Sequence, residues 1–254
     1  MLKSLLGSLL VAGLPAAALA GGDHSHHAVN QSGAVLSPEN VEADQTYDIL
    51  AAHVHRKGRI VTFHMTLKGA AGTSQPEAKG AFGGAGIHTY VWPTSLDPAS
   101  VGFEGGKGVL ALAAAIHPDF DDTPLFDESG DGDVGNDGDK WHSHWVVLTP
   151  NGACGAGSLS VQDIAEGAAP KMPATWPGVP IYIDSPGFSP VFDGPEIAIN
   201  VAFDDPSIVE GMKYDGVTSA LRINQNIHAP LACVVDVFDV ASGDLSLPGE
   251  ITDK

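Results

Sequence analysis

Residues 47–67 read YDILAAHVHRKGRIVTFHMTL, in which apolar and polar side chains alternate on both sides of a short Arg-Lys-Gly-Arg turn. Alternation with a period of two is typical of strands that bury one face. We therefore predict strands at 47–55 and 59–68, joined by a two-residue loop at Lys57-Gly58.

The register of this hairpin decides where its histidines lie. With that loop, His53 pairs with Thr62 and lies diagonally across from His64. Because side chains alternate along a strand, His53, His55 and His64 then share one face, and the opposite face is apolar. The hairpin is therefore predicted to carry a cluster of three imidazoles.

Short apolar runs broken by Gly, Pro, Asn and Asp continue along the rest of the chain. The 31 glycines and 18 prolines disfavour long helices, and the best helix start is Asp205-Pro206, an acidic cap followed by proline. We predict an all-β fold, an antiparallel β-sandwich of Greek-key or jelly-roll type with long Gly/Pro/Asp-rich loops. Its further strands are predicted at 86–92, 109–116, 141–149, 157–163, 179–184, 196–203, 217–225 and 232–240.

The N-terminal twenty residues have the pattern of a signal peptide: Lys3, an apolar run, and a small-residue cleavage site at Ala18-Leu19-Ala20. The apolar run is shorter than the roughly 20 residues that a membrane-spanning helix needs, which disfavours a retained anchor. We predict a signal peptide at 1–20, a flexible His-containing tail at 21–46 and a single domain at 47–254. The protein is then periplasmic, secreted or at the cell surface.

The two cysteines, Cys154 and Cys233, are an even number in an oxidising compartment, so we predict one disulfide bond. A copper–thiolate site would need one of them free. The formal charge of −19 argues against nucleic acid and anionic membranes as partners. It also attracts cations, although solubility or a salty habitat explains an acidic composition equally well.

Two His-x-His sequences suggest a transition-metal site. His142 and His144 project from the same side of one predicted strand, with Cα atoms roughly 7 Å apart, so both rings can reach one ion at about 2.0–2.1 Å. His53 and His55 repeat the arrangement. We rank His142 and His144 first as ligands; His53, His55 and His64 follow, and His88 or His117 could complete the site. The alternative is that these are hydrogen-bonded structural histidines.

Imidazole ligands suit copper and zinc, and copper heads the affinity order. Residues 141–145, Trp-His-Ser-His-Trp, resemble the zinc-binding strand of α-type carbonic anhydrases, in which His-x-His-Trp supplies two of three ligands. The resemblance covers these residues alone, and no following strand carries a third histidine at comparable spacing. We interpret it as convergence on a ligand geometry.

An acidic segment precedes this strand. From Asp127, oxygen-bearing side chains stand at positions one, three and five and glycine at six, as in a calcium-binding loop, although position twelve is Gly138 instead of Glu. We predict a structural calcium site, the alternative being a solvated acidic loop. Its predicted ligands are Asp127, Ser129, Asp131, Asp133, Asp137 and Asp139.

No nucleophile elbow, phosphate loop or His-Glu-x-x-His helix occurs in the sequence. We therefore predict an exported metal-binding protein that binds copper, or zinc, through strand histidines and calcium through the acidic loop. One alternative is a secreted metalloenzyme, in which three histidines and an open coordination position activate water. Another is a calcium-stabilised surface or adhesion protein without a transition metal.

Overall fold

The computed structural model describes residues 33–76, 86–117, 140–226 and 228–254. Within these ranges the regular structure is β-strand with three short 3₁₀ helices, η1 (Pro98–Val101), η2 (Gly152–Cys154) and η3 (Pro206–Val209). No helix in this part of the chain is long and apolar enough to cross a membrane. Among the strands of the described residues, every pair is antiparallel except β15 with β2, so the predicted all-β antiparallel fold is confirmed.

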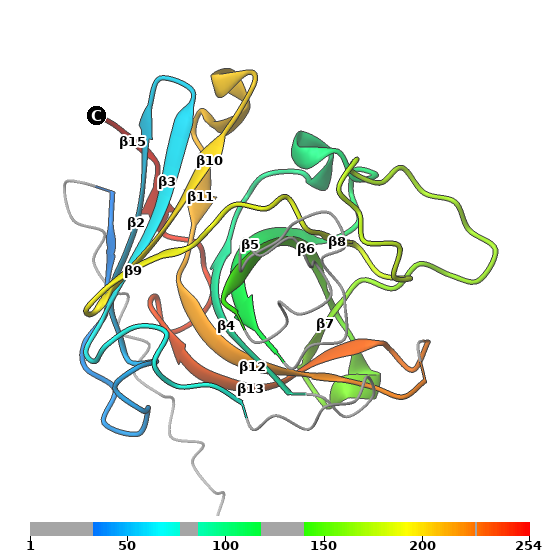
Figure 1. Cartoon of the computed structure of the whole chain (residues 1–254), viewed down its shortest axis with the longest axis horizontal. Helices are drawn as coiled ribbons and strands as arrows, with labels where there is room; N and C mark the ends of the chain where they lie inside the picture. Colours follow the sequence, from blue (N-terminus) through cyan, green and yellow to red (C-terminus); the bar gives the residue numbers. More distant parts are fainter. Residues whose placement is uncertain (1–32, 77–85, 118–139, 227) are drawn as a thin grey trace, which may run out of the picture.

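The larger sheet closes into a six-stranded barrel. Its strands run in the order β5-β4-β12-β13-β7-β6, and β6 pairs back with β5. Figure 1 looks down this barrel, and β8 extends the wall beside β6. The predicted sandwich is not confirmed, because this sheet closes on itself. The six barrel strands are β4 (Gly86–Pro93), β5 (Val109–Ile116), β6 (His142–Pro150), β7 (Leu159–Val161), β12 (Val217–Ile223) and β13 (Ala232–Val240), and the added strand β8 is Ile183–Asp184.

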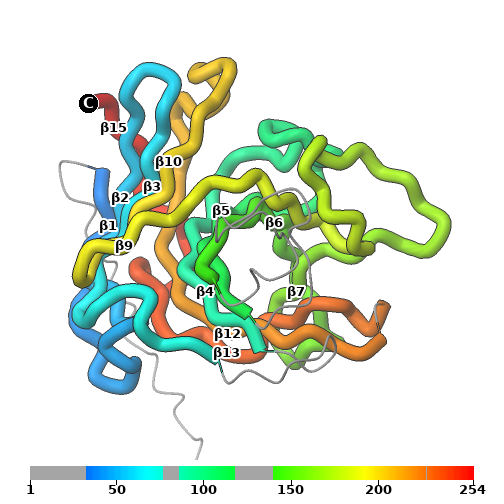
Figure 2. The backbone as a smooth tube through the Cα atoms, in the orientation of Figure 1, coloured from blue at the N-terminus to red at the C-terminus, as the bar shows by residue number. Residues whose placement is uncertain are grey.

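A second sheet stands beside the barrel, as the tube in Figure 2 shows. Phe63 of this sheet packs edge-on against Trp92 and Trp145 of the barrel wall, with ring centroids 6.2 and 5.9 Å apart. All three side chains are buried, so β4, β5 and β6 are covered on their outer face too. The strands of the second sheet are β1 (Val35–Leu36), β2 (Ile49–Lys57), β3 (Ile60–Leu67), β9 (Val191–Asp193), β10 (Glu196–Ala202) and β15 (Thr252–Asp253); β11 (Lys213–Tyr214) and β14 (Gly249–Glu250) form a small third sheet.

Strand β5 shows why the sequence folds in this way. Its residues alternate between two cores: Leu110, Leu112 and Ala114 face the second sheet, whereas Ala111, Ala113 and Ala115 face the barrel interior. A strand buried on both faces has no polar side to present, which explains the unbroken run VLALAAAI at 109–116. The small alanine side chains of β5 face the interior of the six-stranded barrel.

The first hairpin is present, but its predicted register is wrong by two residues. His53 lies directly opposite His64, and Lys57 pairs with Ile60, so the loop is Gly58-Arg59. Gly58 has a φ of +61°, which a glycine adopts easily at the first position of a II′ loop. Because the difference is an even number of residues, the side chains keep their predicted faces.

The predicted cap at Asp205 is confirmed, since its carboxylate accepts a hydrogen bond from the Ser207 amide at 2.9 Å. The helix that follows, η3, is a single 3₁₀ turn. Five strands of two or three residues were not predicted, because such lengths are too short to show a period. One of them, β1, lies in the segment 21–46 that we expected to be a tail; the unpredicted strands are β1, β9, β11, β14 and β15.

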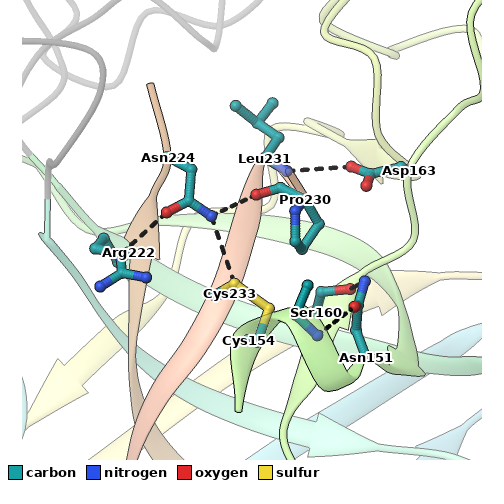
Figure 3. The surroundings of a disulfide bond; sticks show 10 residues. Asn151, Cys154, Ser160, Asp163, Arg222, Asn224, Pro230, Leu231 and Cys233 are labelled. Atoms are coloured by element: carbon teal, nitrogen blue, oxygen red, sulfur yellow. Dashed lines mark hydrogen bonds between the residues drawn. A yellow bond between two sulfur atoms is a disulfide. The ribbon is translucent and has the colours of Figure 1, made fainter. Parts of the chain in front are cut away.

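The predicted disulfide bond is confirmed between Cys154 and Cys233, whose Cα atoms are 5.4 Å apart (Figure 3). It joins η2 to β13. At this place in the described structure β13 and β7 share a single residue pair, Cys233 with Ser160. The disulfide therefore reinforces the shortest junction of the barrel wall.

Candidate metal centre

Three histidines meet at the barrel. His117, His142 and His144 are almost completely buried, with 2–3% of their surface exposed, and each offers one nitrogen within 4.8 Å of the other two. In the ranges that the structure describes, no other group of three His, Cys, Asp or Glu side chains meets this spacing. We call these residues the histidine triad.

The pairing of β5 with β6 positions the triad. His142 and His144 begin β6 and lie opposite Ala115 and Ala113, while His117 follows β5 two residues after Ala115. All three belong to the face that points into the barrel, because side chains alternate along each strand. The alanine side chains opposite the two β6 histidines leave room for the imidazole rings.

Hydrogen bonds at Nδ1 orient two of the rings. Nδ1 of His142 lies 2.8 Å from the Lys140 carbonyl oxygen, and Nδ1 of His144 lies 3.2 Å from both the Asp184 carbonyl oxygen and the Ser185 hydroxyl. A carbonyl oxygen only accepts, so Nδ1 of His142 is the donor and the lone pair of the neutral ring is on Nε2. The Ser185 hydroxyl can donate or accept, so the contacts of His144 orient its ring without fixing its tautomer. Metal-binding histidines are commonly oriented by such second hydrogen bonds.

The third ring approaches on the Nε2 side. Nε2 of His117 lies 3.0 Å from Nε2 of His142, so without a metal one of the two nitrogens must donate a proton to the other. Two imidazole nitrogens on one tetrahedral ion with bonds of about 2.0 Å lie roughly 3.3 Å apart. A metal could therefore replace the shared proton after a small movement of the rings.

The hairpin histidines are in a different place, on the second sheet. The rings of His53 and His64 are 4.5 Å apart between centroids, those of His53 and His55 are 5.5 Å apart, and Nε2 of His64 lies 2.8 Å from a Glu196 carboxylate oxygen. The sequence predicted that these three histidines share a face. It did not predict Glu196, which reaches the cluster from β10, a strand far away in sequence.

Burial changes the proton affinity of the hairpin histidines. It lowers the pKa of His53 to about 4, with the neighbouring His64 and His55 adding to the effect. Burial also lowers the pKa of His64, against the opposing attraction of Glu196, and that of His55, to which Lys254 contributes. These rings are therefore neutral at pH 7.

We expect this cluster to make folding stability fall below pH 6.5. Unfolded His53 binds a proton near pH 6.5, whereas the folded residue binds it near pH 4, so protonation favours unfolding as the pH falls through this window. Between pH 7 and 4, the free energy of unfolding should fall by about 1–2 kcal/mol more in wild type than in a His53→Gln variant. This is less than the full pKa shift implies, because the ring is partly exposed. Urea unfolding of both proteins across this pH range measures the difference. Parallel stability curves would contradict the interpretation.

His88 does not belong to the triad. Its Nδ1 lies 2.7 Å from the Tyr47 hydroxyl, and its ring packs against Tyr47 and Phe238 on the outer side of the barrel wall. Its role there is one of packing and hydrogen bonding. The tryptophans beside the triad are packing residues too: Trp145 contacts Phe63, and the indole nitrogen of Trp141 donates to the Gly72 carbonyl at 3.0 Å.

The predicted calcium ligands fall outside the described residues. They all belong to the segment 118–139. The calcium site therefore stays a prediction from the sequence.

Comparisons with protein-family models, with curated proteins and with solved structures find no match to this chain.

Proposed function

We propose that this is an exported protein that binds one transition-metal ion through His117, His142 and His144. The observation that carries the proposal is the convergence of three buried imidazole nitrogens within 4.8 Å of one another. The hydrogen bond from Nδ1 of His142 to the Lys140 carbonyl, which makes Nε2 the metal-binding nitrogen of that ring, supports it. A disulfide bond is consistent with export to an oxidising compartment.

Copper is the metal we propose first, with zinc as the alternative. Neutral imidazoles bind both ions, and for a given set of nitrogen ligands copper binds more tightly. Methionine or thiolate ligands would favour Cu(I), but both cysteines are in the disulfide. Calcium is proposed separately for the acidic segment, on its sequence pattern alone.

A metalloenzyme is the second candidate, and one feature of the triad supports it. His117 and His144 line a partly open cavity inside the barrel, whereas a storage or transport site can be shallow and filled by protein ligands. Three protein ligands also leave a fourth position of a tetrahedral ion for water or substrate. Such water can be activated at neutral pH.

The direct test is metal titration of chelator-treated protein with Cu(II) and Zn(II). A background with His24→Gln, His26→Gln and His27→Gln removes the histidines of the N-terminal segment. We expect one equivalent of tightly bound ion and a higher melting temperature, because an ion that binds only the folded state stabilises it. If neither ion binds at micromolar concentration, the proposal is wrong.

A further inference from the structure

The barrel contains a cavity of about 110 Å³ that adjoins the triad. Its wall is made by the inward-facing side chains of β4, β5, β6, β7, β12 and β13, with the segment around β8, and most of these are aliphatic. His117 and His144 are part of this wall. The cavity and the histidine triad therefore share two residues.

The two hydroxyls in the wall are already paired with each other. Thr89 donates to the Ser219 carbonyl oxygen at 3.1 Å, and the hydroxyls of Thr89 and Ser219 lie 2.8 Å apart. Both hydroxyl protons are therefore used within the wall. A molecule in the cavity meets apolar surface everywhere except at the histidines, so its body must be apolar and its polar group must face the triad.

The volume indicates how much of that molecule the barrel can surround. In another protein, an apolar cavity of about 150 Å³ holds one benzene molecule. The present cavity is somewhat smaller and is partly open to solvent, so the space inside the barrel matches a single six-membered ring.

The charge of the protein favours a phenol over a benzoate as the ring that carries the oxygen donor. A benzoate would have to enter a protein with a formal charge of −19 and give up its hydration in an apolar cavity. A phenol is neutral at pH 7, because its hydroxyl has a pKa of about 10. A metal ion held by the triad can then coordinate the phenol oxygen.

We propose that the barrel is the binding site for a single-ring phenol, with the ring in the apolar cavity and the oxygen on the metal ion held by the triad. This inference rests on the proposed function for the metal. On coordination the hydroxyl proton passes to solvent water, so the bound species is the phenolate.

The test compares 4-fluorophenol with 4-fluorotoluene, which has the same shape but no oxygen donor, by ¹⁹F nuclear magnetic resonance. Metal-free protein should bind both weakly and about equally. After loading with diamagnetic zinc, 4-fluorophenol should bind at least about tenfold more tightly while 4-fluorotoluene is unchanged. Zinc-loaded protein that binds neither compound, or that does not distinguish them, overturns the inference and leaves the metal proposal intact. Failure to take up zinc overturns the inference, and failure to take up copper as well overturns the proposed function.

A variant that fills the cavity tests whether the fluorinated compounds bind there. Val161 lines the cavity and pairs with Leu148, four residues along β6 from His144, so Val161→Phe fills the cavity at a distance from the triad. It should abolish binding of both fluorinated compounds and retain zinc uptake. Val191→Phe, at an exposed position of the second sheet, is the matched control and should bind as wild type does. Undiminished 4-fluorophenol binding by a folded Val161→Phe protein places the compound elsewhere and overturns the inference.

Discussion

Replacing His117 with glutamine should lower the affinity for Cu(II) or Zn(II) by more than about 100-fold. Glutamine has a similar volume, so the strand pairing should survive, but one of three ligands is lost. Loss of a residue that only orients a ligand already costs about 10–100-fold, and loss of a ligand should cost more. Competition with a chelator of known affinity, in the background without the N-terminal histidines, measures the change.

His88→Gln is the matched control for this variant. His88 is a partly buried histidine that also lies next to β5, but its ring faces Tyr47 and Phe238 instead of the triad. Its affinity should stay within about twofold of wild type. If both variants bind the metal as wild type does, the ion is not held by the triad. If both lose it equally, the effect comes from the fold and not from ligation.

Removing the disulfide bond should lower the free energy of unfolding by about 4 kcal/mol. The bond closes a loop of 79 residues, and loop-closure entropy in the unfolded chain gives this magnitude. The folded state gives a second reason to expect a loss of stability. Among the described residues, β13 and β7 pair through one residue pair only, and the disulfide lies at that pair. Urea unfolding of a Cys154→Ala/Cys233→Ala variant against oxidised wild type tests the prediction.

Reduction of the wild-type protein provides the control, since it breaks the same bond without changing the sequence. Both proteins should unfold at similarly low urea concentrations. A loss below about 1 kcal/mol in the variant would mean that the junction is held by packing and hydrogen bonds alone. Metal affinity of the folded variant should change little, because the triad depends on the β5–β6 pairing.

The sequence predicted those parts of the site that depend on local spacing. His142 and His144 stand two apart on one strand, and alternation alone places them on one face. The face of His117 was also predictable, because it continues the row Ala111, Ala113, Ala115. Its contact with His142 was not, because it requires β5 to pair with β6 in one particular register.

Local spacing could not distinguish the two His-x-His sequences. His53 and His55 have the same spacing as His142 and His144, but their strand belongs to the second sheet. What meets them there is His64 and a Glu196 carboxylate, and this group does not reach the close spacing of the triad. The two His-x-His sequences differ in the strands that pair with them, and strand pairing cannot be predicted from local sequence patterns.

Closure of the barrel could not be predicted from the sequence for a similar reason. Alternating strands with short turns suit a sandwich and a barrel equally well, and closure depends on the pairing of β5 with β6 and of β13 with β7. The apolar run at 109–116 was the available signal, since a strand without a polar face must be covered on both sides. We predicted the strand but not its second covering layer.

The most direct test of the central claim is anomalous X-ray diffraction from crystals of the copper- or zinc-loaded protein. The account predicts one strong metal peak with three imidazole nitrogens, from His117, His142 and His144, at about 2.0–2.1 Å. A peak at His53, His55 and His64 instead, or metal-soaked crystals in which the three triad rings hold no ion, would contradict it.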